Sequence, residues 1–419
     1  MKITDVFEEW TAYAERKVLF PRDFDSDLII RTSSSKIVAI TGVRRSGKSS
    51  FLMLLYQRLK REGHTVGYVN LEDSRIKDNR ETLDEIIKWF GDSGYLILDE
   101  ITSAHDWQGW LGRSHELLKD QLHLIISSSQ KSLLAPNKPL RGRIIPFEML
   151  PLSFREYLEF RGVKPKKTTA SRGEVERIFL EYATYGGFPE VSLTDDKTDR
   201  VRILNSYFRD IVGLDIAEAA REDPGTAELF GKYALQSPYF SASKCLNFFK
   251  SLGYRMGKER LLQLEQYSEA GSLFSFLPIF SFSIRDRAQY PRKVYCSDIG
   301  FYYAITGKND WGRLYENIAL LELRRRAHGL QEICYWKNQQ GFEIDFVVME
   351  GTVIREAIQV VYSLDDVKTE KREIRSLLAC KKELEPKVTY VLTRDVSETK
   401  TFDGIEITFI PLMDWLLKS

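Results

Sequence analysis

The sequence is poor in the residues that hold disulfide or zinc frameworks together. Its 419 residues include only four cysteines, Cys245, Cys296, Cys334 and Cys380, which are widely spaced and lie mostly inside apolar segments. None belongs to a CxxC pair or stands near a histidine, the spacings that indicate zinc sites. We therefore expect four reduced, buried thiols and no zinc site.

A long hydrophobic run is also missing. No stretch reaches the roughly 18 uncharged apolar residues that span a bilayer. The first residues, Met1-Lys2-Ile3-Thr4-Asp5, lack the apolar core of a signal peptide. We expect a cytoplasmic protein without a membrane partner.

Neither sign of charge dominates. The chain has 61 Lys and Arg against 60 Asp and Glu, a formal net charge of +1. No global basic field therefore attracts nucleic acid, and any DNA or RNA site must be a local patch. The length predicts two or three domains, because single hydrophobic cores stop growing well below this size.

The first third of the chain alternates apolar strands with amphipathic helices, which predicts a buried parallel sheet and an α/β fold. Residues 173–270 have mainly helical periodicity, and a separate α/β domain begins near residue 309. We expect an α/β core over residues 1–160, a mainly helical region over 161–300, and a third domain over 301–419. The strands predicted for the core are residues 36–41, 65–71, 95–98 and 122–127.

A phosphate-binding loop stands between the first of these strands and a helix, with the sequence Gly42-Val43-Arg44-Arg45-Ser46-Gly47-Lys48-Ser49. Such loops offer converging backbone N–H groups and one mobile cation to a phosphate chain. The spacing places Lys48 on the β- and γ-phosphates of ATP, Ser49 on Mg²⁺ and Ser50 near the α-phosphate. The predicted nucleotide-binding residues are Gly42, Arg44, Arg45, Ser46, Gly47, Lys48, Ser49 and Ser50.

Two carboxylates end another predicted strand, in Tyr95-Leu96-Ile97-Leu98-Asp99-Glu100. Asp99 is suited to hold Mg²⁺, and Glu100 is suited to polarise the attacking water, so we expect ATP hydrolysis. The alternative is a solvated strand end. Ser127, which opens Ser127-Ser128-Ser129, could orient the water, although a serine-rich turn explains it nearly as well.

Phosphoryl transfer also gains from an arginine over the transferring group, supplied by the same chain or by a neighbouring subunit. The candidates are Arg141 and Arg143. The alternative is a pair of surface arginines in a loop, and Arg44 and Arg45 inside the phosphate loop are rivals for the role.

As a set, these stretches resemble the prokaryotic AAA-type ATPases with a C-terminal domain of unknown function. The resemblance includes Leu140-Arg141-Gly142-Arg143, Leu150-Pro151-Leu152-Ser153-Phe154-Arg155-Glu156-Tyr157, Tyr185-Gly186-Gly187-Phe188-Pro189-Glu190 and Tyr315-Glu316-Asn317. It implies an ATPase core, a small lid, a winged-helix-like segment and a C-terminal domain similar to PD-(D/E)XK nucleases. The family's usual Thr-Gly-Ser after the third strand is Ser127-Ser128-Ser129 here, so a hydroxyl is kept.

Two helices near residues 241–251 and 258–267 have the spacing of a helix-turn-helix or winged helix. Their basic side is suited to phosphates, although it could equally belong to a protein-packing module with solvated lysines. The DNA-binding candidates are Lys244, Arg255, Lys258 and Arg260, with Lys337 further along the chain.

In the nuclease-like domain, Glu316, Asp345, Gln359 and Val361 occupy the places of the acids and the Glu-x-Lys pair of such a nuclease. Metal-dependent cleavage needs carboxylates for Mg²⁺ and a lysine near the attacking water. Gln359 is neutral and Val361 carries no charge, so we expect this domain to lack nuclease activity.

Two functions fit the sequence. The first is a Mg-ATP-dependent ATPase that binds and remodels or translocates DNA, including branched DNA such as Holliday junctions, as a ring oligomer, for example a hexamer. The second is an ATP-driven signalling or protein-remodelling ATPase that has a protein partner and no DNA substrate.

Overall fold

A computed structural model describes residues 2–130 and 140–418. The chain divides into two compact units. One unit runs to Pro151 and takes in Ala270–Ser272, and the other consists of Leu152–Glu269 and the chain from Leu273 onward. The division into three parts at residues 160 and 300 stays a prediction.

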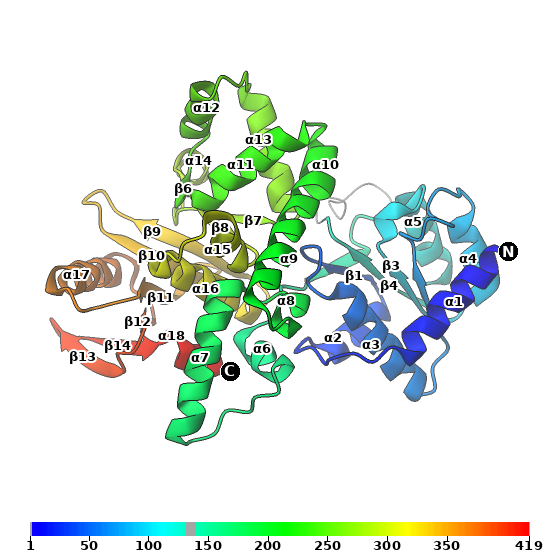
Figure 1. The fold of residues 1–419 in the computed structure, drawn as a ribbon, viewed down its shortest axis with the longest axis horizontal. Helices are drawn as coiled ribbons and strands as arrows, with labels where there is room; N and C mark the ends of the chain where they lie inside the picture. Colours follow the sequence, from blue (N-terminus) through cyan, green and yellow to red (C-terminus); the bar gives the residue numbers. More distant parts are fainter. Residues whose placement is uncertain (1, 131–139, 419) are drawn as a thin grey trace. The chain divides into compact units, whose positions relative to one another are not determined.

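The first unit is built on a five-stranded parallel sheet with the strand order β2-β3-β4-β1-β5 (Figure 1). Its strands are β1 (Ile37–Thr41), β2 (Val66–Asn70), β3 (Gly94–Asp99), β4 (Leu122–Ser128) and β5 (Ile144–Glu148). Its helices are α1 (Ile3–Arg16), α2 (Ser26–Ser33), α3 (Lys48–Arg61), α4 (Thr82–Phe90) and α5 (Trp107–Leu118). The predicted parallel α/β core is confirmed.

Both faces of this sheet are buried, because successive residues of a strand point to opposite sides. On β1, Ile37 and Ala39 join a core with side chains of α4 and α5, whereas Val38 and Ile40 join a core with side chains of α2 and α3. The continuous apolar strands noted in the sequence reflect this two-sided burial.

The second unit begins with helices and a small three-stranded sheet of order β6-β8-β7. A π-helical stretch, Ile211–Ala217, continues α9. The helices of this part are α6 (Phe154–Phe160), α7 (Thr169–Tyr185), α8 (Pro189–Leu193), α9 (Lys197–Asp210), α10 (Glu218–Ala220), α11 (Pro224–Gln236), α12 (Ala242–Ser251), α13 (Lys258–Ala270), α14 (Ile284–Gln289) and α15 (Gly300–Thr306), and the strands are β6 (Tyr239–Phe240), β7 (Phe274–Leu277) and β8 (Arg292–Cys296). The helix pair α12–α13 lies where the sequence predicts it.

A six-stranded mixed sheet, with the order β13-β14-β12-β11-β10-β9, completes this unit. One face packs against α17, and the other packs against α16, α18, α6 and α7. Its strands are β9 (Gln331–Lys337), β10 (Glu343–Glu350), β11 (Val353–Val361), β12 (Val388–Thr393), β13 (Glu398–Phe402) and β14 (Ile405–Pro411), and its helices are α16 (Trp311–Arg326), α17 (Val367–Leu384) and α18 (Leu412–Leu417).

All four cysteines are free and buried, and burial raises the pKa of each thiol to about 12. Across the described ranges, no helix has the length and apolar character needed to cross a bilayer.

Asp298 ties together two glycine-rich segments of the second unit. Its carboxylate accepts hydrogen bonds from Gly187 N at 2.7 Å and Gly300 N at 2.8 Å. Burial raises the pKa of this carboxyl to about 7, although both N–H donors act in the opposite direction. Gly186 ends α7 beside it with φ +77° and ψ −169°, a conformation that is essentially restricted to glycine.

We expect Gly186→Ala to destabilise the protein far more than Gly307→Ala. A Cβ at Gly186 would lie 1.6 Å from Asp298 Oδ1, whereas a Cβ at Gly307, with φ +67°, has no neighbour within 4 Å. Left-handed backbone at Gly307 costs alanine roughly 1–2 kcal/mol. The clash at Gly186 should raise the loss to about 3 kcal/mol or more. Urea unfolding of both variants measures the difference, and equal losses would contradict the packing described here.

Candidate nucleotide site

The phosphate loop packs tightly against the chain that follows β5. Gly42 has φ +143°, and a Cβ there would lie 2.1 Å from the carbonyl oxygen of Met149. Only glycine fits this close approach. The loop is thereby held directly at the carboxyl end of β1, where it leads into α3.

The loop has the features of a phosphate site. Gly47 caps α3 without any side-chain hydrogen bond, which leaves the first N–H groups of the helix open to an anion. The Ser46 hydroxyl is buried and has no hydrogen-bond partner among the described residues. These donors fit the phosphate chain of a nucleotide.

Lys48 reaches back across the loop from the first position of α3. Its side chain is only 4 % exposed, and Nζ donates to Gly42 O at 3.0 Å and Val43 O at 3.3 Å. Nζ also lies 3.7 Å from Glu100 Oε1. The ammonium therefore stands between the loop and the carboxylate that follows β3.

Asp99 and Glu100 share a network with the end of β4. Asp99 is fully buried; Ser127 donates to its Oδ1 and the Tyr68 hydroxyl donates to its Oδ2 at 2.7 Å. The backbone N–H of Glu100 donates to Ser127 Oγ at 2.8 Å, and Ser129 N donates to Glu100 Oε2 at 3.2 Å. The structure thus brings Lys48, Asp99, Glu100 and Ser127 together.

The parallel pairing of the strands explains this convergence. β4 lies between β1 and β3, with Ile40 beside Ser127 and Leu98 beside Ile126. Ligands of open α/β sheets bind outside the carboxyl ends of the strands. The carboxyl ends of β1, β3 and β4 lie side by side here.

Burial raises the pKa of the Glu100 carboxyl above its ordinary value, and the Lys48 ammonium offsets part of that shift. Burial next to Asp99 raises the pKa of Tyr68 well above its ordinary value, so its hydroxyl stays protonated and donates. A carboxylate of increased basicity beside a buried ammonium is suited to accept a proton from water.

Arg141 and Arg143 lie at the opposite end of the strands, next to the amino ends of β1 and β5. Ile37 N, which begins β1, donates to Arg143 O at 2.8 Å, and the Arg143 side chain pairs with Glu116 at 2.7 Å. The exposed Arg141 precedes it in the same turn. A five-residue strand is about 16 Å long, so neither guanidinium reaches the phosphate loop of its own chain.

The remaining loop residues have separate surroundings. Arg44 pairs with Glu72 at 3.0 Å, Arg45 is exposed with φ +68°, and Ser49 and Ser50 are half-buried in the first turn of α3.

Sequence reasoning missed two residues that support the site. Arg22 donates to Ser46 O at 2.6 Å and to Leu150 O at 3.0 Å, and so joins the loop to the segment after β5. Tyr68 holds Asp99. Neither belongs to a local motif, because each reaches the site only through the folded chain.

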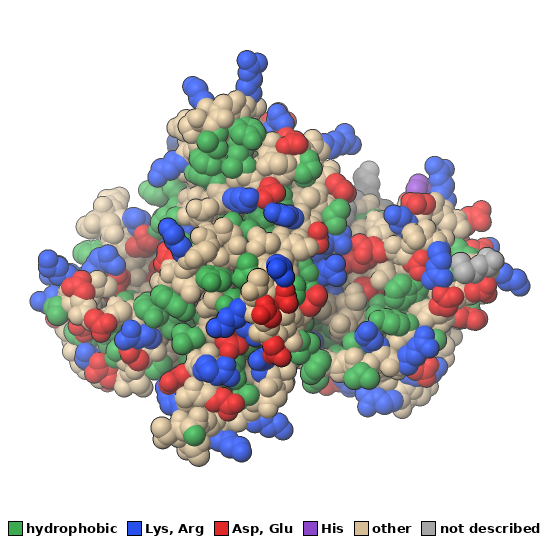
Figure 2. Space-filling view, in the orientation of Figure 1, with side chains coloured by type: hydrophobic (Ala, Val, Ile, Leu, Met, Phe, Trp, Pro, Cys, Tyr) green, Lys and Arg blue, Asp and Glu red, His purple; other side chains and the backbone are tan. Residues whose placement is uncertain are grey.

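The DNA-binding candidates fall into two places. Lys244, Arg255 and Lys258 are exposed on and between α12 and α13, where Figure 2 shows basic side chains projecting at the top of the view. Arg260, on α13, is paired with Glu222. Lys337 is apart from them on β9 and lies 3.1 Å from Glu343.

The nuclease-like residues come together in a separate cavity of the second unit. Glu316, Asp345, Gln359 and Val361 all line it, and the buried Val361 also joins the core that packs on α17. Among the residues that the structure describes, no group of three histidine, cysteine, aspartate or glutamate side chains has an arrangement that could hold a metal ion.

Comparison with known families matches both ends of the chain. Residues 34–158 match the family described as AAA domain, and residues 311–415 match the domain of unknown function DUF4143. An uncharacterised protein of Methanocaldococcus jannaschii is 29% identical over 84% of this chain and 80% of its own. One from Haemophilus influenzae is 25% identical over 91% of this chain and 94% of its own.

Solved structures give only distant likenesses. AMPPCP-bound DnaA from Aquifex aeolicus is 13% identical over 61% of this chain and 90% of its own, with a TM-score of 0.28. C. elegans PCH-2 is 14% identical over 64% of this chain and 68% of its own, with a TM-score of 0.26.

The parallel sheet, the phosphate loop and the family match define a P-loop ATPase domain of the AAA type. More particularly, the chain joins this AAA domain at its N-terminal end to a C-terminal DUF4143 domain. The family resemblance noted from the sequence is confirmed.

We expect Tyr68→Phe to destabilise the first unit by about 1–3 kcal/mol, because Asp99 Oδ2 loses the hydroxyl that donates to it in a buried site. Tyr95→Phe is the matched control: Tyr95 is half-buried on β3, and none of the described residues hydrogen-bonds to its hydroxyl. Denaturant unfolding of both variants checks this. Equal stabilities would show that Asp99 does not depend on Tyr68.

Proposed function

We propose that the protein is a Mg-ATP-dependent ATPase that binds and remodels or translocates DNA as a ring oligomer in the cytoplasm. The observation that carries the ATPase part is the convergence of Lys48, Glu100 and the Asp99–Ser127 pair at one sheet edge. In this proposal the phosphate loop binds ATP, and the carboxylates of Asp99 and Glu100 act in its hydrolysis.

The residues of the site have distinct roles in this proposal. Lys48 would bind the β- and γ-phosphates, and Ser49 and Asp99 would hold Mg²⁺, which would neutralise phosphate charge. Glu100 accepts the proton of the attacking water. Ser127 keeps Asp99 and the Glu100 backbone in register through its two hydrogen bonds.

A second subunit completes the site in the proposal. Arg141 and Arg143 lie too far from the phosphate loop of their own chain to act there, so either could serve only a neighbouring subunit. An arginine supplied in this way can stabilise the charge of phosphoryl transfer. This placement supports an oligomer, for which we propose a ring.

DNA is the proposed substrate because α12 and α13 present Lys244, Arg255 and Lys258 to solvent. A phosphate backbone is bound by such a local basic patch even when the net charge is near zero. The nuclease-like domain without its Glu-x-Lys pair supports recognition of branched DNA, such as a Holliday junction, without cleavage.

A protein partner is the second candidate. The same helix pair exposes apolar side chains: Leu252 is 51 %, Tyr254 44 % and Leu262 41 % exposed. Apolar side chains gathered at one place favour protein contact rather than phosphate contact. ATP-dependent protein remodelling would use this surface.

We expect DNA to stimulate ATP turnover, with a four-way junction more effective than duplex or single strands. Lys48→Ala should abolish turnover, whereas Lys60→Ala, an exposed lysine of the same helix, should leave it unchanged. A Lys244→Ala/Lys258→Ala variant should keep basal turnover and bind DNA with a smaller salt dependence, because fewer counterions are released. A phosphate-release assay and binding titrations at several salt concentrations measure these effects.

The outcomes separate the two candidates. Turnover that none of the three DNA forms changes, together with no binding at low salt, would contradict a DNA substrate. Recovery of a stoichiometric protein by Glu100→Gln only in the presence of ATP would then favour the protein-remodelling function.

We expect subunit mixing to reveal a shared site. Glu100→Gln and an Arg141→Ala/Arg143→Ala variant should each be inactive, and their mixture should regain part of the activity, because some interfaces then join an intact Glu100 to intact arginines. ATP turnover of the mixture, compared with each variant alone, is the measurement. No recovery, despite exchange shown by labelled subunits, would rule out both arginines in this role.

A further inference from the structure

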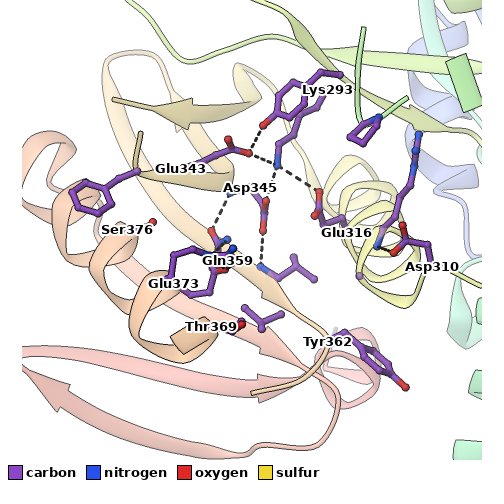
Figure 3. Close-up of a pocket in the computed structure, with 18 of the residues that line it drawn as sticks. Lys293, Asp310, Glu316, Glu343, Asp345, Gln359, Tyr362, Thr369, Glu373 and Ser376 are labelled. Atoms are coloured by element: carbon purple, nitrogen blue, oxygen red, sulfur yellow. Dashed lines mark hydrogen bonds and ion pairs between the residues drawn. The ribbon is translucent and has the colours of Figure 1, made fainter. Parts of the chain in front are cut away.

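A lysine that belongs to no recognised motif lines the cavity in the second unit. Lys293, on β8, is 5 % exposed, and Figure 3 shows its side chain pointing toward carboxylates of α16 and β10. The cavity has a volume of about 780 Å³.

Three carboxylates surround the Lys293 ammonium. Nζ lies 2.6 Å from Asp345 Oδ1, 3.0 Å from Glu343 Oε1 and 3.5 Å from Glu316 Oε2. Coulomb attraction to these groups raises the pKa of Lys293 although burial opposes it, and its ammonium remains charged. The carboxylates are thus gathered around a cation that the chain itself provides.

The surrounding contacts hold this arrangement. Asp345 Oδ2 accepts a hydrogen bond from Val360 N at 2.9 Å, so both of its oxygens are engaged. The hydroxyls of Tyr295 and Tyr239 donate to Glu316 and Glu343 respectively. Each carboxylate therefore has a partner besides the ammonium.

The metal that a nuclease of this shape would need does not fit these residues. Gln359 is neutral, its Oε1 accepts from Asp345 N at 3.2 Å, and its Nε2 donates to Glu373 at 2.7 Å. Val361 is buried in the apolar core. The Asp345 oxygen that faces the other acids is occupied by Lys293.

An unpaired buried charge is costly, so gathered carboxylates need either a metal ion or another cation. The long lysine side chain brings a compact charge into that position from a different sheet. Without Lys293, Asp345, Glu343 and Glu316 would repel one another, and burial together with Asp345 already raises the pKa of Glu316 to about 7.

We propose that Lys293 is a built-in cation that takes the place of a divalent metal, which makes this cavity a metal-independent site without phosphodiester cleavage. The inference deepens the part of the proposed function that assigns no nuclease activity to the domain. It is independent of ATP hydrolysis.

The test is Mn²⁺ binding to the full chain without nucleotide, followed by electron paramagnetic resonance. The wild type should bind no Mn²⁺ in this cavity. Lys293→Met should melt at a lower temperature, gain one Mn²⁺ per chain and recover stability when Mn²⁺ is added, because the freed carboxylates then take the metal. Lys308→Met, at an exposed position of the same unit, should change neither property.

Asp345→Asn added to Lys293→Met should remove the gained Mn²⁺ site. If Lys293→Met cannot be purified, the wild-type titration alone decides: no Mn²⁺ in the cavity supports the proposal. Wild-type binding of one Mn²⁺ that Ser49→Ala retains and Asp345→Asn loses would overturn it. So would Mg²⁺- or Mn²⁺-dependent DNA cleavage that Asp345→Asn abolishes, and neither result would bear on ATP turnover.

Discussion

The pairing of β4 with both β1 and β3 is the constraint on which the nucleotide site depends. It places the phosphate loop, the Asp99–Glu100 carboxylates and Ser127 at one sheet edge. The two-sided apolar core fixes that register, because a one-residue slip would turn each buried side chain to the wrong face. The close approach of Gly42 to Met149 then ties the loop to the chain beyond β5.

Buried lysines and carboxylates are arranged differently in the two units. In the first, one ammonium and one carboxylate, Lys48 and Glu100, lie 3.7 Å apart, close enough to interact and separate enough for each to change partner. In the second, Lys293 directly contacts Asp345 at 2.6 Å and shares its charge with two further acids. The first arrangement is suited to chemistry and the second to a fixed structure.

Much of the nucleotide site could be predicted because its parts are contiguous in sequence. The phosphate loop and the Asp99–Glu100 pair each follow an apolar strand, and parallel strands carry their ends to one edge. Tyr68 and Arg22 could not be found in this way, since they act through hydrogen bonds across long sequence separations. Lys293 lies before residue 300, outside the stretch 301–419 that resembles a nuclease domain.

The fold was predicted unevenly for similar reasons. The strands of the first core, buried on both faces, have continuous apolar sequences, whereas β5 and β13 are partly exposed edge strands with mixed sequences and were missed. The helices α1 and α2 were also not predicted from the sequence.

The position of Arg143 at the amino end of β1 has a consequence for how the protein would be controlled. If that arginine or Arg141 serves catalysis, a single chain can bind ATP but lacks an arginine that contributes to its hydrolysis. The rate per chain would then rise with protein concentration, and whatever gathers or separates the chains would set ATP consumption without touching the phosphate loop.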